Sequence, residues 1–230
     1  LQQSDLEIRY HFTLFSNAVS AVVAYGDIDK IKEIEGVEQV HIVPQYEIQE
    51  TADTNTVTAG EMIGSVQAWE SGYTGAGERI AIIDTGIDAD HPSFDPGAFR
   101  YGLEMAGQEK KKNISDYHLL GQEEIENVLT QLNAKSLKQD LKGQDVFFND
   151  KIAFGFNYVD RDLNITHDKD SQGDHGTHVA GIAAANQYVP KADGGYEEPE
   201  NGVMGVAKNA QLLVMKVFGS GGGAYTDDYM

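Results

Sequence analysis

The chain has 230 residues, of which 40% are hydrophobic, enough to form a buried core in one large domain or two small ones. Its 17 Lys and Arg against 37 Asp and Glu give a net charge of −20, so we expect neither a nucleic-acid partner nor an anionic membrane surface, because phosphates would be repelled. The absence of cysteine excludes disulfides, thiolate zinc sites and a cysteine nucleophile, and no apolar run approaches the roughly 18 residues of a membrane span.

The N-terminal part of the chain is predicted to form a small unit of three strands and one helix. Residues 8–15 and 19–25 are predicted strands joined by a turn, and residues 27–35 are a short helix with three isoleucines on one face. Residues 37–43 alternate apolar and polar side chains like a half-buried strand, which Pro44 ends. This β-β-α-β unit is too small to be a secure domain alone, so we expect it to pack on the rest of the chain.

A polar segment, residues 49–60, separates this unit from a second one that is predicted to be α/β. Three nearly continuous apolar runs are typical of strands buried on both faces of a parallel sheet: residues 78–84, 151–159 and 210–218. Residues 175–185, "HGTHVAGIAAA", are predicted to form a helix between the last two of these strands. This alternation indicates a parallel sheet with crossover helices.

A charged segment, residues 95–150, interrupts the α/β pattern. Within it, the run "EEIENVLTQLNAKSL" has a helical stripe of four apolar side chains, which we expect to pack on the main body: Ile125, Val128, Leu129 and Leu132. We interpret the segment as a peripheral insertion.

Asp84 is the first candidate for chemistry, because it ends the apolar run "IAIID" and functional residues of open parallel sheets lie beyond the carboxyl ends of the strands. By itself it is better explained as the cap of a tight turn, and the local sequence alone does not overturn that explanation. The motif "GDHGTHVAG" offers partners, since His175 and His178 share one face of a helix for which Asp174 is a plausible N-cap. A histidine in the first helical turn favours the neutral imidazole that a general base needs.

Three kinds of site are compatible with these residues. An aspartic protease would use the Asp-Thr-Gly at Asp84, but it needs two such carboxylates and the chain has one copy. A metal site would combine His175, His178 and Asp174 or Asp84, but the helical metalloprotease motif places its histidines four apart and has a glutamate where Gly176 stands. A Ser-His-Asp apparatus would have Asp84 orient His175, with a serine later in the chain.

The two motifs together identify a family. "IAIIDTGIDADHP" and "HGTHVAG" resemble the aspartate and histidine motifs of the subtilisin-like serine proteases, and "GVMGVAKNAQLLVMKVFGSGGGAY" resembles the segment that follows them. The resemblance covers roughly residues 58–230. The long gap between the two motifs is similar to that of the large cell-envelope subtilases of the lactocepin type and of their minor extracellular relatives.

The resemblance implies roles for particular residues. Asp84 is the acid of the triad, His175 is the general base, and His178 is a structural neighbour. The residues that would hold the substrate backbone against a strand edge, by β-augmentation, are Gly221, Gly222, Gly223 and Tyr225, with Tyr225 near the pocket for the residue four before the cut.

The N-terminal unit resembles the second half of the inhibitor-type propeptide of this family, a ferredoxin-like module whose tail lies in the cleft as a product-like strand. Here that tail would be about residues 44–56. The expected organisation is a partial propeptide at 1–48, a processing region at 49–57, and the N-terminal part of the catalytic domain at 58–230. The chain would then be a piece of a longer protein at both ends.

The family's nucleophile motif, Gly-Thr-Ser-Met, and its oxyanion-hole asparagine do not occur before Met230, and neither Ser171 nor Ser220 has the right context to replace the nucleophile. We therefore expect residues 1–230 alone to be inactive. The chemistry requires no cofactor, although Asn157, Asp160 and Asp162 match positions that bind structural calcium in some members; a solvated acidic loop is as good an explanation. Asp168 and Asp170 also begin like an EF-hand loop, which lacks its final glutamate.

The predicted fold class is therefore α/β, a subtilisin-like parallel sheet with helices on both faces, preceded by a partial ferredoxin-like α+β module. The expected function is a bacterial serine endopeptidase, secreted or wall-associated, with proteins as substrates and its own propeptide as intramolecular inhibitor. The alternative is a non-catalytic product, either an inhibitory propeptide-containing fragment or a pseudoprotease.

Overall fold

The computed structural model describes residues 6–14, 16–47, 62–166, 174–199, 203–219 and 223–229, and the predicted processing region at 49–57 lies outside them. Within these ranges the strands are β1 (Glu7–Phe12), β2 (Ala18–Val22), β3 (Gln45–Glu47), β4 (Arg79–Asp84), β5 (Ile152–Asn157), β6 (Val189–Pro190), β7 (Tyr196–Glu197), β8 (Gln211–Lys216) and β9 (Gly223–Tyr225). The α-helices are α1 (Ile28–Lys32), α3 (Ser65–Glu70), α4 (Pro96–Lys110), α5 (Gln122–Val128), α6 (Asn133–Leu137), α7 (Gly143–Val146), α8 (His175–Ala184) and α9 (Thr226–Tyr229). None of the helices in this part of the chain is long and apolar enough to cross a membrane.

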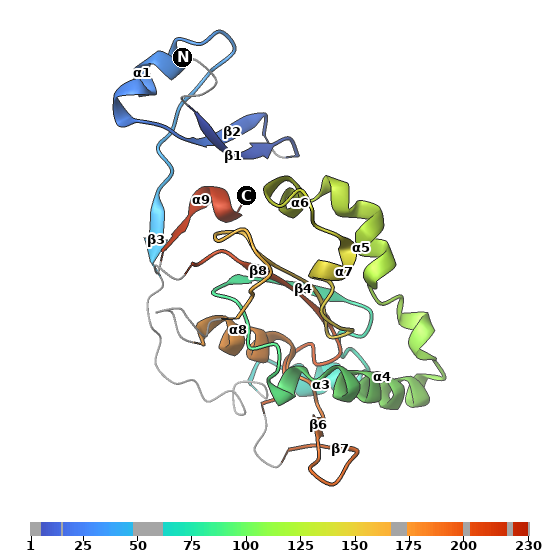
Figure 1. Cartoon of the computed structure of the whole chain (residues 1–230). Helices are drawn as coiled ribbons and strands as arrows, with labels where there is room; N and C mark the ends of the chain where they lie inside the picture. The colour runs from blue at the N-terminus through green and yellow to red at the C-terminus, as the bar shows by residue number, and fades with distance from the viewer. Residues whose placement is uncertain are drawn as a thin grey trace.

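The centre of the molecule is a parallel sheet with the strand order β4-β8-β5 (Figure 1). These are the three strands expected from the apolar runs, each slightly shorter than its run. Strand β8 lies between the other two, and its last residue, Lys216, is aligned with Asp84 of β4 and with Asn157 of β5. The carboxyl ends of all three strands therefore meet at one edge of the sheet.

Helices cover both faces of this sheet, as predicted. On one face Ala180 and Ala184 of α8 pack on Ile82, Leu212 and Val214. On the other face the buried side chains of α5, α6 and α7 pack on β5 and on Leu213 and Met215 of β8. The small alanines of α8 allow the helix to lie close to the strands, which fixes the position of its first residue at the sheet edge.

Strand β4 departs from the expectation of burial on both faces. Ile82 is buried, but Ala81 is exposed and Ile83 is 45% exposed, because β4 is an edge strand of the described sheet and no described helix covers this face of it. Strand β5, by contrast, is buried at every position.

The N-terminal unit forms a β-hairpin from β1 and β2, followed by α1. The predicted strand at 37–43 is wrong, because this stretch has no regular structure and the chain becomes extended only at β3. Helix α1 is also shorter than the predicted 27–35, and the isoleucines expected on one face are not fully buried. The hairpin and the one short helix that the structure describes here do not confirm the expected partial ferredoxin-like module.

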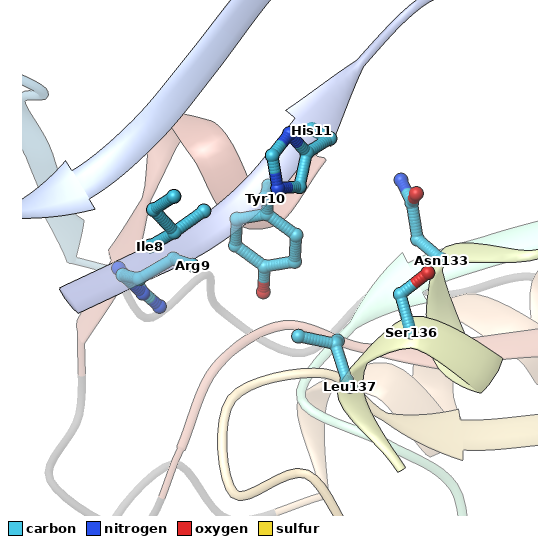
Figure 2. Close-up of a pocket in the computed structure, with 7 residues that line it drawn as sticks. All are labelled: Ile8, Arg9, Tyr10, His11, Asn133, Ser136 and Leu137. Carbon is cyan, nitrogen blue, oxygen red and sulfur yellow. The ribbon is translucent and has the colours of Figure 1, made fainter. Parts of the chain in front are cut away.

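The regular secondary structure of the insertion at 95–150 is all helical, and its helix α6 contacts strand β1 of the N-terminal unit. In the predicted apolar stripe, Ile125 and Leu129 are buried and Leu132 is partly buried, but Val128 is 42% exposed, because the helix ends there and the chain turns away. A crevice of about 190 Å³ remains between β1 and α6, with Tyr10 and Leu137 among its lining residues (Figure 2). The insertion thus supports the N-terminal unit rather than standing apart from it.

Lys151, at the start of β5, is a fully buried cation among apolar side chains. Its Nζ donates to the carbonyl oxygens of Ala210 at 2.8 Å and Lys208 at 3.2 Å and lies 4.9 Å from the ring centroid of Phe99. Burial lowers the pKa of Lys151 to about 7, because the charged form loses its hydration.

This burial predicts a pH dependence of stability. Between about pH 7 and 10.5 the unfolded chain binds a proton at Lys151 that the folded protein has released, so the free energy of unfolding rises with pH in this window, by about 1.4 kcal/mol per pH unit. Lys151→Met removes this pH-dependent contribution to the free energy of unfolding. Chemical denaturation at pH 7.5 and 9 should show the wild type gaining stability relative to the variant. An equal difference at both pH values would contradict the prediction.

Candidate active site

Asp84 and His175 come together at the carboxyl edge of the sheet. Asp84 is the last residue of strand β4, and His175 is the first residue of helix α8. His175 Nδ1 lies 2.7 Å from Asp84 Oδ1, a distance at which the imidazole N–H donates to the carboxylate. The His175 side chain is 29% exposed and that of Asp84 is 13% exposed, so the pair is sheltered but the ring still faces solvent. Such a pair can hold an imidazole in the orientation and tautomer that proton transfer requires.

Thr85 forms hydrogen bonds to Asp84 and to the residue next to His175. Its amide N–H donates to Asp84 Oδ1 at 2.7 Å, and its Oγ1 accepts from the amide of Gly176, next to His175, at 2.9 Å. Its carbonyl oxygen accepts from Nζ of Lys216 at 2.6 Å. Thr85 is completely buried, so these bonds are protected from water.

Two glycines allow the turn after β4 and the start of α8 to touch. A Cβ on Gly176 would stand 2.1 Å from the carbonyl oxygen of Gly86, and one on Gly86 would stand 2.2 Å from the carbonyl oxygen of Ile165. Gly86 also has a φ of 107°, which side chains disfavour. The Asp84–His175 distance therefore depends on both residues being glycine.

Asp174 stands at the predicted N-cap position of α8, but its side chain makes no capping hydrogen bond; its carbonyl oxygen instead accepts from the amide of His178 at 2.9 Å. His178 is exposed on α8. Among the described residues there is no group of three or more His, Cys, Asp or Glu side chains arranged to hold a metal ion. The geometry thus favours the acid–base pair over the metal site built from the same motif.

The predicted calcium ligands lie at the end of β5 and in the loop that follows it, where they form hydrogen bonds. Asn157 Oδ1 accepts from the amide of Asp160 at 3.0 Å, and Asn157 Nδ2 donates to Asp160 Oδ2 at 2.9 Å. Asp162 Oδ1 accepts from the amide of Asn164 at 2.9 Å. The side chains expected to bind calcium are thus already engaged in hydrogen bonds with neighbouring residues. The EF-hand-like Asp168 and Asp170 lie outside the described residues.

The strand edge expected to hold substrate is occupied by the chain itself. Strand β3 pairs antiparallel with β9, with Gln45 opposite Tyr225 and Glu47 opposite Gly223. A Cβ on Gly223 would stand 2.0 Å from Nε2 of Gln45, so the absence of a side chain permits the close approach of an extended segment. Gly221 and Gly222, and the excluded serines Ser171 and Ser220, lie outside the described residues.

Comparison with known proteins identifies the family of the chain. The family model described as the subtilase family, Peptidase_S8, matches residues 75–230, more than half of the chain. The chain belongs to the subtilase family. The family implies the α/β sheet seen in the structure.

Several curated subtilases are similar to the chain. A PII-type proteinase of Lactococcus lactis subsp. cremoris is 33% identical over 205 residues, covering 88% of this chain and 9% of the relative. The minor extracellular protease Vpr of Bacillus subtilis is 30% identical, covering 72% of this chain and 13% of that protein. An intracellular serine protease of Paenibacillus polymyxa is 28% identical, covering 82% of this chain and 38% of that protein. The chain thus spans only a small part of the length of these relatives.

Thr85 and Lys216 were not predicted as site residues from the sequence. For Lys216 a signal exists, because a lysine near the end of the apolar run "AQLLVMKVF" must find a partner when the strand is buried. Its alignment with Asp84 could not be read from the sequence, since nothing local specifies that β8 pairs with β4.

Proposed function

We propose that the protein is a subtilisin-like serine endopeptidase that hydrolyses peptide bonds in proteins. His175 takes the proton of a serine hydroxyl as the serine attacks the scissile carbonyl, and then gives it to the leaving amine. Asp84 stays ionised and stabilises the imidazolium that forms in between. The single observation that carries this proposal is the 2.7 Å contact between His175 Nδ1 and Asp84 Oδ1 at the sheet edge. The serine and the oxyanion-hole asparagine would follow Met230, as the family pattern implies.

We infer further that the N-terminal unit inhibits this active site. The pairing of β3 with β9 supports this role, because a substrate would add to the same strand edge. Tyr225, which ends β9, is 38% exposed and has the Arg9 guanidinium 5.4 Å from its ring centroid. The unit therefore covers both the edge and the end of the strand that would hold the substrate.

A buried polar cluster holds the N-terminal hairpin to α9. Arg9 lies 2.8 Å from Asp228 Oδ1 and 3.2 Å from Asp227 Oδ2, and the Tyr10 hydroxyl donates to Asp228 Oδ1 at 2.8 Å. Ser20 donates its hydroxyl to Asp227. Burial raises the pKa of Asp228 and that of Tyr10. Buried ion pairs of this kind lose much stability when one partner is removed, so they suit a unit that must stay in place until it is cleaved off.

The names of the relatives divide between extracellular and intracellular proteases. Because the match to the lactococcal proteinase covers the larger share of this chain, we propose a secreted or wall-associated bacterial enzyme of the cell-envelope type. Calcium at the loop of Asn157, Asp160 and Asp162 is proposed as a structural ion only. The alternative function is a non-catalytic inhibitory fragment or pseudoprotease.

Labelling with a fluorophosphonate tests the proposed function. The full-length gene product, freed of residues 1–48, should react stoichiometrically at one serine after Met230 and hydrolyse casein. A purified 1–230 chain should not react. Reaction of the 1–230 chain would place the nucleophile within it, and absence of both labelling and hydrolysis in the full-length protein would favour the pseudoprotease.

A further inference from the structure

Lys216 is a buried cation beside the acid–base pair that the proposed reaction does not use. It ends β8, its side chain is almost fully buried, and in the parallel ladder it stands opposite Asp84. The amide of the next residue, Val217, donates to the carbonyl oxygen of Asp84 at 2.9 Å. A lysine is costly at such a place, because its ammonium must be taken out of water.

The ammonium is directed at the turn that carries the pair. Nζ of Lys216 donates to the carbonyl oxygen of Thr85 at 2.6 Å, and the lysine Cδ lies 3.3 Å from where a Cβ of Gly86 would be. The side chain therefore both packs against this turn and bonds to it.

Thr85 transmits this contact to Asp84 and His175. The Thr85 carbonyl binds Lys216, and the Thr85 amide donates to Asp84 Oδ1. The Thr85 hydroxyl oxygen accepts from the amide of Gly176, in the first turn of α8. A shift of the Thr85 carbonyl would move the carboxylate and the start of α8 by different amounts. The His175–Asp84 distance would then change.

We propose that Lys216 is a positioning residue for the acid–base pair, which it holds through its hydrogen bond to the Thr85 turn. This inference rests on the proposed function for its catalytic meaning, but the geometry that it describes can be measured without turnover.

The experiment compares two buried lysines in the full-length protein. Lys216→Met removes the ammonium at the carboxyl edge, and Lys151→Met is the matched control, since Lys151 also donates to backbone carbonyl oxygens from a buried place but lies at the amino end of β5. The first readout is the far-downfield proton NMR signal of His175 Nδ1–H, assigned by its loss in His175→Gln. The second is the separate measurement of kcat and KM on a peptide substrate.

We expect Lys216→Met to shift or broaden the His175 signal and to lower kcat by about 10- to 100-fold, with KM within about twofold, because the substrate strand is untouched. Lys151→Met should leave the signal and kcat unchanged. If Lys216→Met does not fold, Lys216→Gln, which keeps a neutral donor for the Thr85 carbonyl, is measured in the same way with a smaller expected effect.

A folded Lys216 variant with an unchanged signal and unchanged kcat overturns the inference, as does an equal effect of Lys151→Met. If the wild type hydrolyses nothing but Lys216→Met still displaces the His175 signal, the proposed endopeptidase fails and the positioning role stands.

Discussion

Replacing His175 by alanine in the full-length protein is expected to lower kcat by about 10³-fold or more, because the serine would lose the base that takes its proton. KM should change little, since the substrate would be held by β9 and not by the imidazole. The measurement is steady-state hydrolysis of a quenched fluorescent peptide. A loss smaller than about tenfold would mean that another residue acts as the base.

Asp84→Asn is the matched variant for this prediction. The amide has the same shape as the carboxylate, so the Thr85 amide keeps its acceptor, but His175 would lose its anionic partner and take the wrong tautomer. We expect a loss in kcat of about 10⁴-fold with an unchanged melting temperature. His178→Ala serves as the control, because His178 is exposed and was assigned no role in proton transfer.

The second large effect is expected from Gly176→Ala. The added methyl group would stand 2.1 Å from the carbonyl oxygen of Gly86 and 3.0 Å from Thr85 Oγ1, so α8 must move away from the turn after β4. A displacement of about 1 Å is enough to reduce kcat by about 10²-fold. The protein should also lose about 2 kcal/mol or more of unfolding free energy through the lost packing and the strained hydrogen bond to Thr85.

Gly181→Ala is the matched control, since it makes the same change in the same helix. A Cβ at Gly181 meets nothing within 4 Å. There the substitution should raise the free energy of unfolding by up to about 1 kcal/mol, because alanine favours the helix more than glycine does, and it should leave kcat unchanged. Equal effects of the two substitutions in thermal melts and activity assays would show that the close contact at Gly176 is not what holds the pair.

These predictions depend on parts of the site that the sequence specified to different degrees. The position of Asp84 at a strand end and the start of α8 at His175 were both predicted correctly, because an apolar run followed by a tight turn and a small-residue helix are local patterns. The strand at 37–43 was wrong. Its alternating side chains fit a sheet partner, but none lies beside it in the described structure, and alternation alone does not make a strand.

The pairing of Asp84 with His175 was inferred from motifs, and the structure supplies the reason why these distant residues meet. Parallel pairing of β4 with β8 and the packing of α8 on one face of the sheet bring the two elements to the same edge. Hydrogen bonds between strands are made by backbone groups that all residues share. The sequence of one strand therefore does not specify which strand pairs with it.

By itself, therefore, the sequence determined the α/β class, the family motifs, and the placement of Asp84 at a strand end and of His175 at a helix start, because each is encoded by a short stretch of side chains. Only the tertiary structure decided that Lys216 stands beside Asp84, that Thr85 holds both members of the pair, and that β3 occupies the edge of β9. It also decided that Arg9 pairs with Asp227 and Asp228. Each of these contacts joins segments far apart in the chain, where only the packing of the whole sheet and its helices fixes which side chains meet.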